Sequence, residues 1–293
     1  MKKMLLFFIF GIFCFYLHSK DNLMTYRIYL DMVFENTDNI YLSKSLENND
    51  LLITYVDINL NGFYKVLDSD GLLKYSDKLP GESPSFYVTN NILFKNLEYV
   101  IEISPINGEV LRTYKTRYMF APDFDDTDKS KRKYKYWLTK DNYLGINNYS
   151  NDGSFTYTMK KLKILENAQI LGVTNGYSSK EIFLLKMIDI NKIDIINYEI
   201  KNHKQKELIS FTTNMQNIEH GKISLSPDGK KIIVLLSDGI KTEIIYYNLY
   251  NQEQDSFMLE YSNVLSIDWA FNSSYFLLMK PTEKILYRVE ISE

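Results

Sequence analysis

The stretch ISLSPDGKKIIVLLSDGIKTEIIYYNL, residues 223–249, contains three apolar runs separated by two Asp-Gly pairs. An Asp-Gly pair is typical of a tight type I′ hairpin turn, because glycine accepts positive φ freely and aspartate tolerates it. The middle run, residues 231–236, is short, nearly continuous in apolar residues and rich in β-branched ones, which is typical of a strand buried on both faces. The stretch therefore predicts three antiparallel strands joined by two turns.

Looser copies of this unit recur along most of the chain. Runs like the middle strand begin near residues 51, 92, 142, 181, 231 and 274, at spacings of 41, 50, 39, 50 and 43 residues. Such spacings are typical of the blades of a β-propeller, so we expect each run to be the second strand of a blade. The strands predicted before the runs are Asn39–Ser45, Ser85–Thr89, Lys135–Thr139, Ala168–Thr174, Lys222–Ser226 and Val264–Ala270. The strands predicted after them are Phe63–Asp68, Tyr99–Ser104, Phe155–Lys160, Ile193–Ile200, Glu243–Leu249 and Ile285–Ile291.

The strand count predicts a closed ring of six blades. The sixth unit has only three strands, whereas the run Tyr26–Phe34 precedes the first unit and belongs to none. We expect this amino-terminal strand to complete the last blade and close the ring, which removes the exposed edges of an open array. Seven blades are the alternative, because residues 116–151 are long enough to contain further strands. Fourth strands are predicted in the first five units, at Leu72–Lys78, Glu109–Lys115, Lys161–Glu166, Glu207–Thr212 and Ser256–Glu260.

The composition agrees with an all-β protein. Seven of the 12 glycines follow asparagine or aspartate, and no long amphipathic helical pattern occurs, so hairpin signals dominate the chain. The hydrophobic fraction of 45% is that of a globular domain. The net charge of −3 argues against a general nucleic-acid-binding protein, because such proteins are normally basic.

The first residues have the pattern of an export signal. Lys2 and Lys3 precede an apolar run over residues 4–17, and Ser19 offers a small residue at a cleavage site. A membrane-spanning helix needs about 20 apolar residues, so we expect cleavage after Ser19, with a retained membrane anchor as the alternative. The chain then divides into a signal peptide, residues 1–19, and a single propeller domain, residues 20–293, which is periplasmic or secreted. The only cysteine, Cys14, lies in the signal, so the mature domain forms no disulfide.

The segment LSPDGKKII, residues 225–233, resembles the blade signature of TolB-like, WD-repeat-like propellers in bacterial envelope proteins. The resemblance is close in this one unit and extends to the other units in pattern alone. It implies a propeller blade and a place in the cell envelope. It does not imply the role of TolB itself, which carries an extra amino-terminal α/β domain for which this chain has no room.

No pattern of catalytic residues is found in the sequence. Outside the signal the only histidines are His203 and His220, and no metalloprotease, P-loop, nucleophile-elbow or dinucleotide motif occurs. Two remote histidines argue against a histidine-based metal site or a catalytic triad. We therefore expect a non-enzymatic, monomeric propeller that binds a protein or glycan partner in the envelope. The alternative is a propeller hydrolase or lactonase whose carboxylates or metal converge in the central channel without a sequence motif.

The segment Arg117–Lys133 interrupts the repeat and is the candidate binding loop, because loops of this length in compact domains are often functional. Its aspartates are spaced partly like a calcium loop, but the sixth position would be Asp128 rather than glycine and the twelfth Tyr134 rather than glutamate. We therefore expect no cofactor, with calcium as the alternative. The candidate residues are Asp123, Asp125, Asp126, Asp128, Lys129, Lys131, Arg132 and Lys133.

Overall fold

The computed structural model describes residues 15–20, 23–30, 34, 39–46, 48–59, 61–78, 85–88, 92–95, 99–104, 106–115, 134–138, 143–149, 155–161, 169–178, 180–260, 267–280 and 284–292. Every regular element in these ranges is a β-strand, and every strand pair is antiparallel. The all-β prediction is therefore confirmed. Over the same ranges, no helical segment has the length and apolar character needed to cross a bilayer.

The described strands form six sheets. Four of them are four-stranded meanders. The first along the chain contains β3 (Asn39–Ser45), β4 (Leu51–Val56), β5 (Gly62–Leu67) and β6 (Leu73–Lys78), and the second contains β7 (Ser85–Val88), β8 (Ile92–Lys95), β9 (Tyr99–Ile103) and β10 (Val110–Lys115). The fourth sheet contains β14 (Gln169–Asn175), β15 (Glu181–Asp189), β16 (Lys192–Glu199) and β17 (Lys204–Thr212), and the fifth contains β18 (His220–Leu225), β19 (Lys231–Ser237), β20 (Thr242–Asn248) and β21 (Gln254–Leu259). The third sheet along the chain contains β11 (Tyr134–Leu138), β12 (Tyr143–Tyr149) and β13 (Phe155–Lys161).

The remaining sheet joins both ends of the chain. Its strand order is β1 (Phe15–Lys20), β2 (Leu23–Tyr29), β24 (Ile285–Ile291), β23 (Tyr275–Lys280) and β22 (Ile267–Trp269). As the sequence predicts, an amino-terminal strand pairs with the last strand of the chain, although it spans Leu23–Tyr29 rather than Tyr26–Phe34. The pairing extends by one residue beyond Tyr29, since the amide of Leu30 donates to the carbonyl oxygen of Lys284. The outer strand β1 was not predicted.

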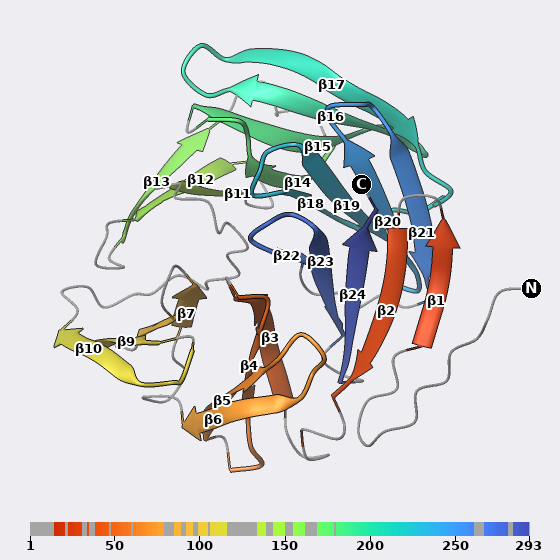
Figure 1. Ribbon diagram of the computed structural model, residues 1–293. Helices are drawn as coiled ribbons and strands as arrows, with labels where there is room; N and C mark the ends of the chain where they lie inside the picture. Colours follow the sequence, from red (N-terminus) through yellow and green to blue (C-terminus); the bar gives the residue numbers. More distant parts are fainter. Residues whose placement is uncertain are drawn as a thin grey trace, which may run out of the picture.

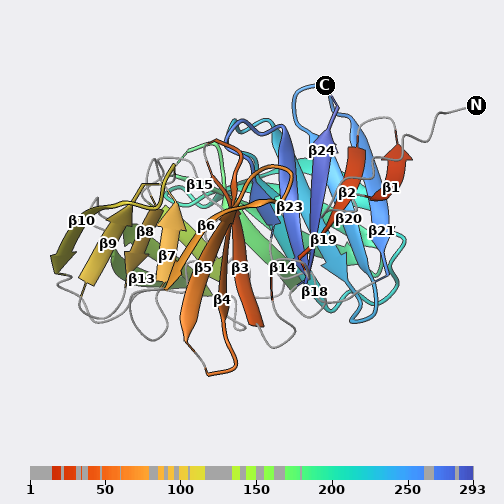
Figure 2. The same ribbon diagram turned by 60° about the horizontal axis from the view of Figure 1, so that its bottom comes forward.

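The six sheets lie around a common centre, as Figure 1 shows. The first strands β3, β14, β18 and β22 lie toward the centre, and the last strands β6, β10, β17 and β21 lie at the periphery. Turned by 60°, the same arrangement presents the strand-connecting turns at two opposite faces (Figure 2). Each described sheet corresponds to one unit of about 40–50 residues in the repeat.

The core lies between neighbouring sheets rather than within any one of them. Side chains of β19 and β20 such as Ile233 and Tyr246 share a cluster with Trp269 and Phe276 of the last sheet. A second cluster joins the last sheet to β4, and a third joins β15 and β16 to β19. Every residue of β19 is buried, as predicted for the middle strand of the quoted stretch. Full burial of one large aliphatic side chain stabilises a fold by about 1.5–3 kcal/mol, so these contacts hold adjacent sheets together.

The two turns of the quoted stretch are not of the predicted type I′. At Pro227-Asp228 the amide of Gly229 donates to the carbonyl oxygen of Ser226, and only Gly229 has positive φ, at 72°. This is a type I turn, in which proline suits the second position and glycine the fourth. In the second turn Gly239 is the first central residue and alone has positive φ, at 85°, which is the type II′ pattern. The hairpins were predicted correctly, and their turn types were wrong.

Two other predictions concern residues outside the described ranges. One is the fourth strand predicted at Lys161–Glu166. Lys161 is the last residue of β13, and the rest of this range lies within residues 162–168, outside the described residues. The region proposed to contain extra strands, residues 116–151, includes β11 and β12 in its described part. Both of these strands belong to the predicted third unit.

Candidate partner-binding surface

All of the site residues predicted from the sequence lie outside the described residues. They are Asp123, Asp125, Asp126, Asp128, Lys129, Lys131, Arg132 and Lys133. The candidate surface is therefore built from other parts of the chain.

The array of sheets has two faces that differ in the turns they carry. The carboxylate of Asp50, in the turn between β3 and β4, forms an ion pair with Lys74 of β6, with 2.7 Å between Oδ2 and Nζ. The first and third turns of a sheet therefore share a face. The amide of Asp228, between β18 and β19, donates to Ser273 Oγ, between β22 and β23, at 3.1 Å, so neighbouring sheets have the same orientation. We call this the hairpin face.

The opposite face carries the turns between second and third strands together with the connections from one sheet to the next. Thr213 follows β17, and its Oγ1 atom donates a hydrogen bond to the carboxylate of Glu243. Glu243 lies near the start of β20, just after the β19–β20 turn. We call this the connector face. An antiparallel meander places alternate turns at opposite ends of its strands, so these two faces account for all the turns.

Exposed apolar side chains concentrate on two neighbouring hairpins of the hairpin face, β5–β6 and β9–β10. Their side chains are between 50% and 73% exposed: Leu72, Leu73, Ile106, Val110 and Leu111. Single exposed apolar residues are ordinary, whereas a group of them on adjacent turns is typical of an interaction surface. We call these five residues the hairpin patch.

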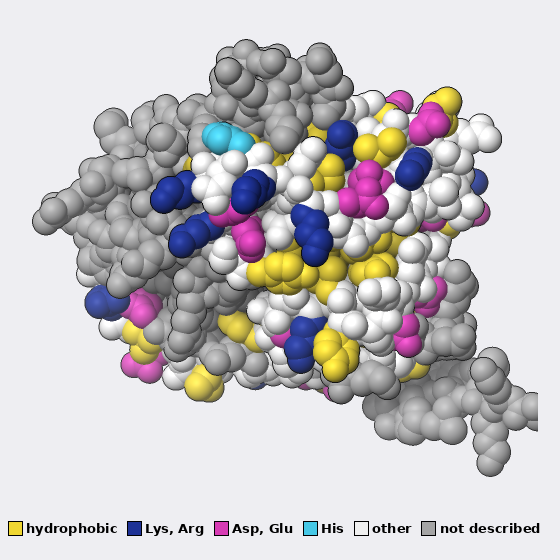
Figure 3. Space-filling view, turned by 90° about the horizontal axis from the view of Figure 1, so that it is seen from above, with side chains coloured by type: hydrophobic (Ala, Val, Ile, Leu, Met, Phe, Trp, Pro, Cys, Tyr) yellow, Lys and Arg dark blue, Asp and Glu magenta, His cyan; other side chains and the backbone are white. Residues whose placement is uncertain are grey.

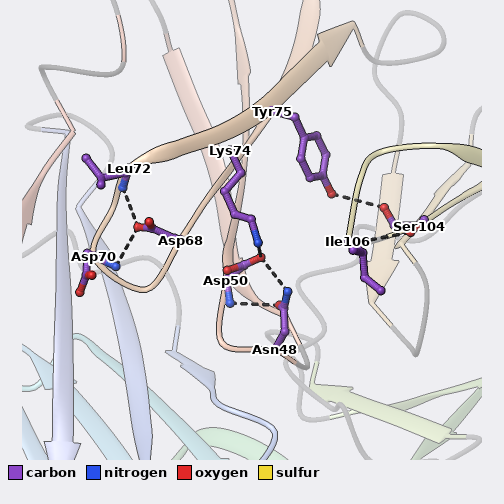
Figure 4. Close-up of polar contacts among 9 residues, drawn as sticks. All are labelled: Asn48, Asp50, Asp68, Asp70, Leu72, Lys74, Tyr75, Ser104 and Ile106. Carbon is purple, nitrogen blue, oxygen red and sulfur yellow. Dashed lines mark hydrogen bonds and ion pairs between the residues drawn. The ribbon is translucent and has the colours of Figure 1, made fainter.

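Tyr75 of β6 joins this strand to the tip of the β9–β10 hairpin (Figure 4). Its hydroxyl donates to the carbonyl oxygen of Ser104 at 3.3 Å, and its ring contacts the turn at Gly108. Gly108 has a φ of 75°, and a Cβ atom there would lie 2.9 Å from the Tyr75 ring. The same ring packs edge-on against Tyr64. Only glycine fits this position, because a side chain would meet both a strained backbone and the aromatic ring.

Burial keeps both tyrosines protonated. Burial is the largest cause of the shift for both side chains. It raises the pKa of Tyr64 to about 12 and raises the pKa of Tyr75 well above its ordinary value. The Tyr75 hydroxyl is therefore a hydrogen-bond donor over the whole physiological pH range.

The turn between β5 and β6 is fixed by its own aspartate. The Oδ1 atom of Asp68 accepts hydrogen bonds from the amides of Asp70 and Leu72, at 3.0 and 2.8 Å. In the facing turn, the amide of Ile106 donates to Ser104 Oγ at 3.3 Å. These bonds position Leu72 and Ile106, which lie on opposite sides of Lys74 and Tyr75 in Figure 4. Local side-chain bonds of this kind preorganise a turn, so both apolar tips are presented without a partner.

The charge at the rim of the hairpin patch is negative. Asp70 and Glu109 are exposed and Asp68 is half-buried, and no lysine or arginine of the described ranges forms an ion pair with any of them. The neighbouring cations have other partners. Arg288 donates to the carbonyl oxygen of Ser69 in the β5–β6 turn and lies 3.0 Å from Glu290. Lys74 lies 2.7 Å from the buried Asp50, which also accepts from Asn48, and Arg112 lies 2.8 Å from Glu102.

The connector face carries three separate isoleucines at matching turns. Ile58, Ile190 and Ile240 lie between the second and third strands of their sheets and are 70%, 65% and 73% exposed. Hydrogen bonds hold the aspartates of two of these turns ionised. The Asn61 side chain is the main cause that lowers the pKa of Asp57, and the amide of Lys241 is the main cause that lowers that of Asp238. Each isoleucine belongs to a different sheet.

The side of the molecule seen in Figure 3 differs from both of these surfaces. A band of hydrophobic side chains crosses it, with basic and acidic side chains on either side. Charges of both signs are mixed there, so this side shows no preference for a charged partner.

His203 and His220 both lie at exposed positions. His203 sits in the turn after β16, where its Nδ1 atom is 2.7 Å from the Tyr198 hydroxyl, and His220 begins β18. Among the described residues no group of three metal-ligating side chains occurs. The hairpin patch was not predicted from the sequence. Its one visible signal was an apolar residue inside a turn, as at Ile106 in Pro-Ile-Asn-Gly.

No protein-family model matches the sequence, and no curated protein matches it. Similar solved structures include the β-propeller domain of Myceliophteria thermophila Cps50 (Swd1), with 9% identity and a TM-score of 0.42 over 87% of this chain and 96% of that one. The C-terminal WD40 domain of Sif2 is 11% identical, with a TM-score of 0.44 over 96% and 93%. XC5397, a gluconolactonase from Xanthomonas campestris, is 7% identical, with a TM-score of 0.44 over 92% and 90%. Because all three TM-scores are below 0.5, we infer neither fold nor function from these similarities.

Proposed function

We propose that this chain is an exported, non-enzymatic β-propeller of six blades that binds a protein partner in the cell envelope. The observation that carries this proposal is the hairpin patch, in which five exposed apolar side chains are held in place on two adjacent hairpins. A surface of this kind costs free energy in water unless a partner covers it.

The contacts between the last and the first sheet support a closed ring. The amide of Ser45, at the end of β3, donates to the carboxylate of the buried Asp268 in β22. The Oγ atom of Ser45 lies 2.8 Å from the hydroxyl of Tyr275. Arg288 of β24 donates from Nη1 to the carbonyl oxygen of Ser69, between β5 and β6, at 3.3 Å. Polar bonds and the shared core therefore join the two sheets that a six-bladed ring brings together.

The export proposal rests on the sequence signal and agrees with the strand count. Cleavage after Ser19 would remove all of β1 except Lys20. The last sheet would then keep β2, β24, β23 and β22, and so would have four strands like the meanders. Mass spectrometry of the protein recovered from the envelope fraction tests this, since a chain that begins at Lys20 is expected. A chain that retains residues 1–19 would contradict cleavage.

Site-specific photo-crosslinking tests the binding function. A photoreactive amino acid replaces Ile106 of the hairpin patch in one variant and Ile240 of the connector face in a matched control, since both side chains are 73% exposed. We expect one recurring protein adduct from position 106 in cells and none of the same mass from position 240. Identical adducts from both positions, or none from position 106, would contradict the proposal.

The segment between β10 and β11 remains a second predicted contact of this partner. Its residues lie outside the described ranges, so it stays a prediction made from the sequence. Replacing residues 123–133 by a Gly-Ser turn is expected to leave the unfolding transition unchanged and to reduce recovery of the partner. Unchanged recovery would remove this segment from the binding surface.

A further inference from the structure

The hairpin patch combines aliphatic side chains with an acidic rim, and this combination restricts its ligand. The five patch residues are leucine, isoleucine or valine, so the patch itself offers no aromatic ring on which a sugar could stack. The carboxylates of Asp68, Asp70 and Glu109 repel anionic glycans and anionic lipid surfaces. A polypeptide segment that offers apolar side chains and positive charge meets both requirements.

Resting on the proposed function, we propose that the hairpin patch binds a segment of a protein partner in which apolar residues are interspersed with lysine or arginine. The apolar residues of the segment would cover Leu72 and Ile106, and the segment would run between them across Lys74 and Tyr75 (Figure 4). Its basic residues would lie beside Asp70 and Glu109. The Asp70 side chain makes no hydrogen bond among the described residues, and Glu109 accepts only from Asn107 at 3.4 Å.

The order of the surface favours this mode of binding. Both tips are already fixed by hydrogen bonds to Asp68 and Ser104, so little conformational entropy is lost by the protein when a segment docks. Lys74 and Arg112 do not compete for the rim carboxylates, because each is held by another acidic residue. The electrostatic preference is therefore for a cationic partner.

Two synthetic peptides of equal length test the inference, one alternating leucine with lysine and the other alternating leucine with glutamate. Binding of each to the full chain is measured by fluorescence anisotropy at low and at high salt. We expect the lysine peptide to bind more tightly and its affinity to fall with salt. D70N and E109Q are each expected to weaken it by up to about fivefold, as exposed ion pairs do. The double reversal D70K/E109K is expected to transfer the preference to the glutamate peptide.

Ile106→Ser is expected to abolish binding of both peptides, whereas Ile240→Ser, at a position of equal exposure on the connector face, is the matched control and leaves binding unchanged. Circular dichroism confirms that each variant folds.

Equal binding of the two peptides, lost in Ile106→Ser, would overturn the charge preference and leave the proposed function intact. No peptide binding together with no adduct from position 106 would overturn both. A concentration-dependent dimer that Ile106→Ser abolishes would show that a second copy of the chain occupies the patch, and would also overturn the inference.

Discussion

The Nζ atom of Lys231 donates a hydrogen bond to the backbone carbonyl oxygen of Ser273, 3.0 Å away in the next sheet. Ser273 lies in the corresponding turn of that sheet, has a φ of 59° and is fully buried. Its Oγ atom accepts from the amide of Asp228, and Asp228 in turn is bonded to Ser226 Oγ. The polar residues of the Ser-Pro-Asp-Gly-Lys-Lys turn therefore fasten one sheet to the next, which is a structural role.

Ser273→Ala is expected to destabilise the protein by about 0.5–1.5 kcal/mol, because the amide of Asp228 loses its hydrogen bond to the buried Ser273 hydroxyl in the next sheet. The free energy of unfolding is measured by urea titration. Ser76→Ala, at an exposed position of β6, is the control and is expected to stay within about 0.5 kcal/mol of the wild type. Equal effects of the two substitutions would show that the bond between the sheets is dispensable.

Deletion of β2 tests whether the two ends of the chain hold the last sheet together. Leu23 and Thr25 of β2 are buried, and the strand pairs with β24 along its whole length. A chain that lacks residues 1–29 is expected to lose its cooperative thermal transition, since β24 would be left with an open edge. A chain that lacks residues 1–19 retains β2 and is expected to unfold like the full chain. Cooperative unfolding of the shorter chain would show that the pairing is not needed for the fold.

Stability is expected to fall above pH 10 because of Tyr64. Burial raises the pKa of this tyrosine from 10.0 to about 12 in the folded protein. A raised pKa means that the neutral phenol is favoured by folding, so its contribution is fully present below pH 10 and is lost as the pH approaches 12. Each pKa unit corresponds to about 1.4 kcal/mol, which gives a loss of roughly 2–3 kcal/mol. Urea titrations at pH 8 and above pH 11 measure this loss, and Tyr64→Phe should reduce it. An unchanged loss in Tyr64→Phe would assign it to other tyrosines.

The strands could be predicted from sequence because their causes are local. The runs at Asn39–Ser45 and Ile285–Ile291 have the same bounds in the structure, since alternating and β-branched residues specify a strand by themselves. The start of β18 was placed two residues late, because His220 and Gly221 have no strand propensity. Gly221 is required there by packing instead: a Cβ atom would lie 2.6 Å from Leu171 of the neighbouring sheet.

The hairpin patch could not be predicted, because it depends on which hairpins become neighbours. Leu72 and Ile106 are separated by 34 residues, and neither turn has an unusual sequence. The packing between their two sheets, including that of Tyr75 against the turn at Gly108, makes these hairpins neighbours. Exposure of an apolar turn residue is likewise a property of the folded ring, since the same residue in a buried turn would belong to the core.

Gly108→Ala tests how the two tips are joined, and Gly229→Ala is its matched control. Both glycines have positive φ, 75° and 72°, so alanine pays a similar backbone penalty of about 1–2 kcal/mol at each site. A Cβ atom at Gly229 would have no atom within 4 Å, whereas one at Gly108 would lie 2.9 Å from the Tyr75 ring.

Gly108→Ala is therefore expected to destabilise the protein more than Gly229→Ala does, as measured by urea titration. It is also expected to weaken binding of the lysine peptide, because the Tyr75 ring must move and the two tips separate. Equal destabilisation and unchanged binding would show that the contact between Tyr75 and Gly108 does not position the patch.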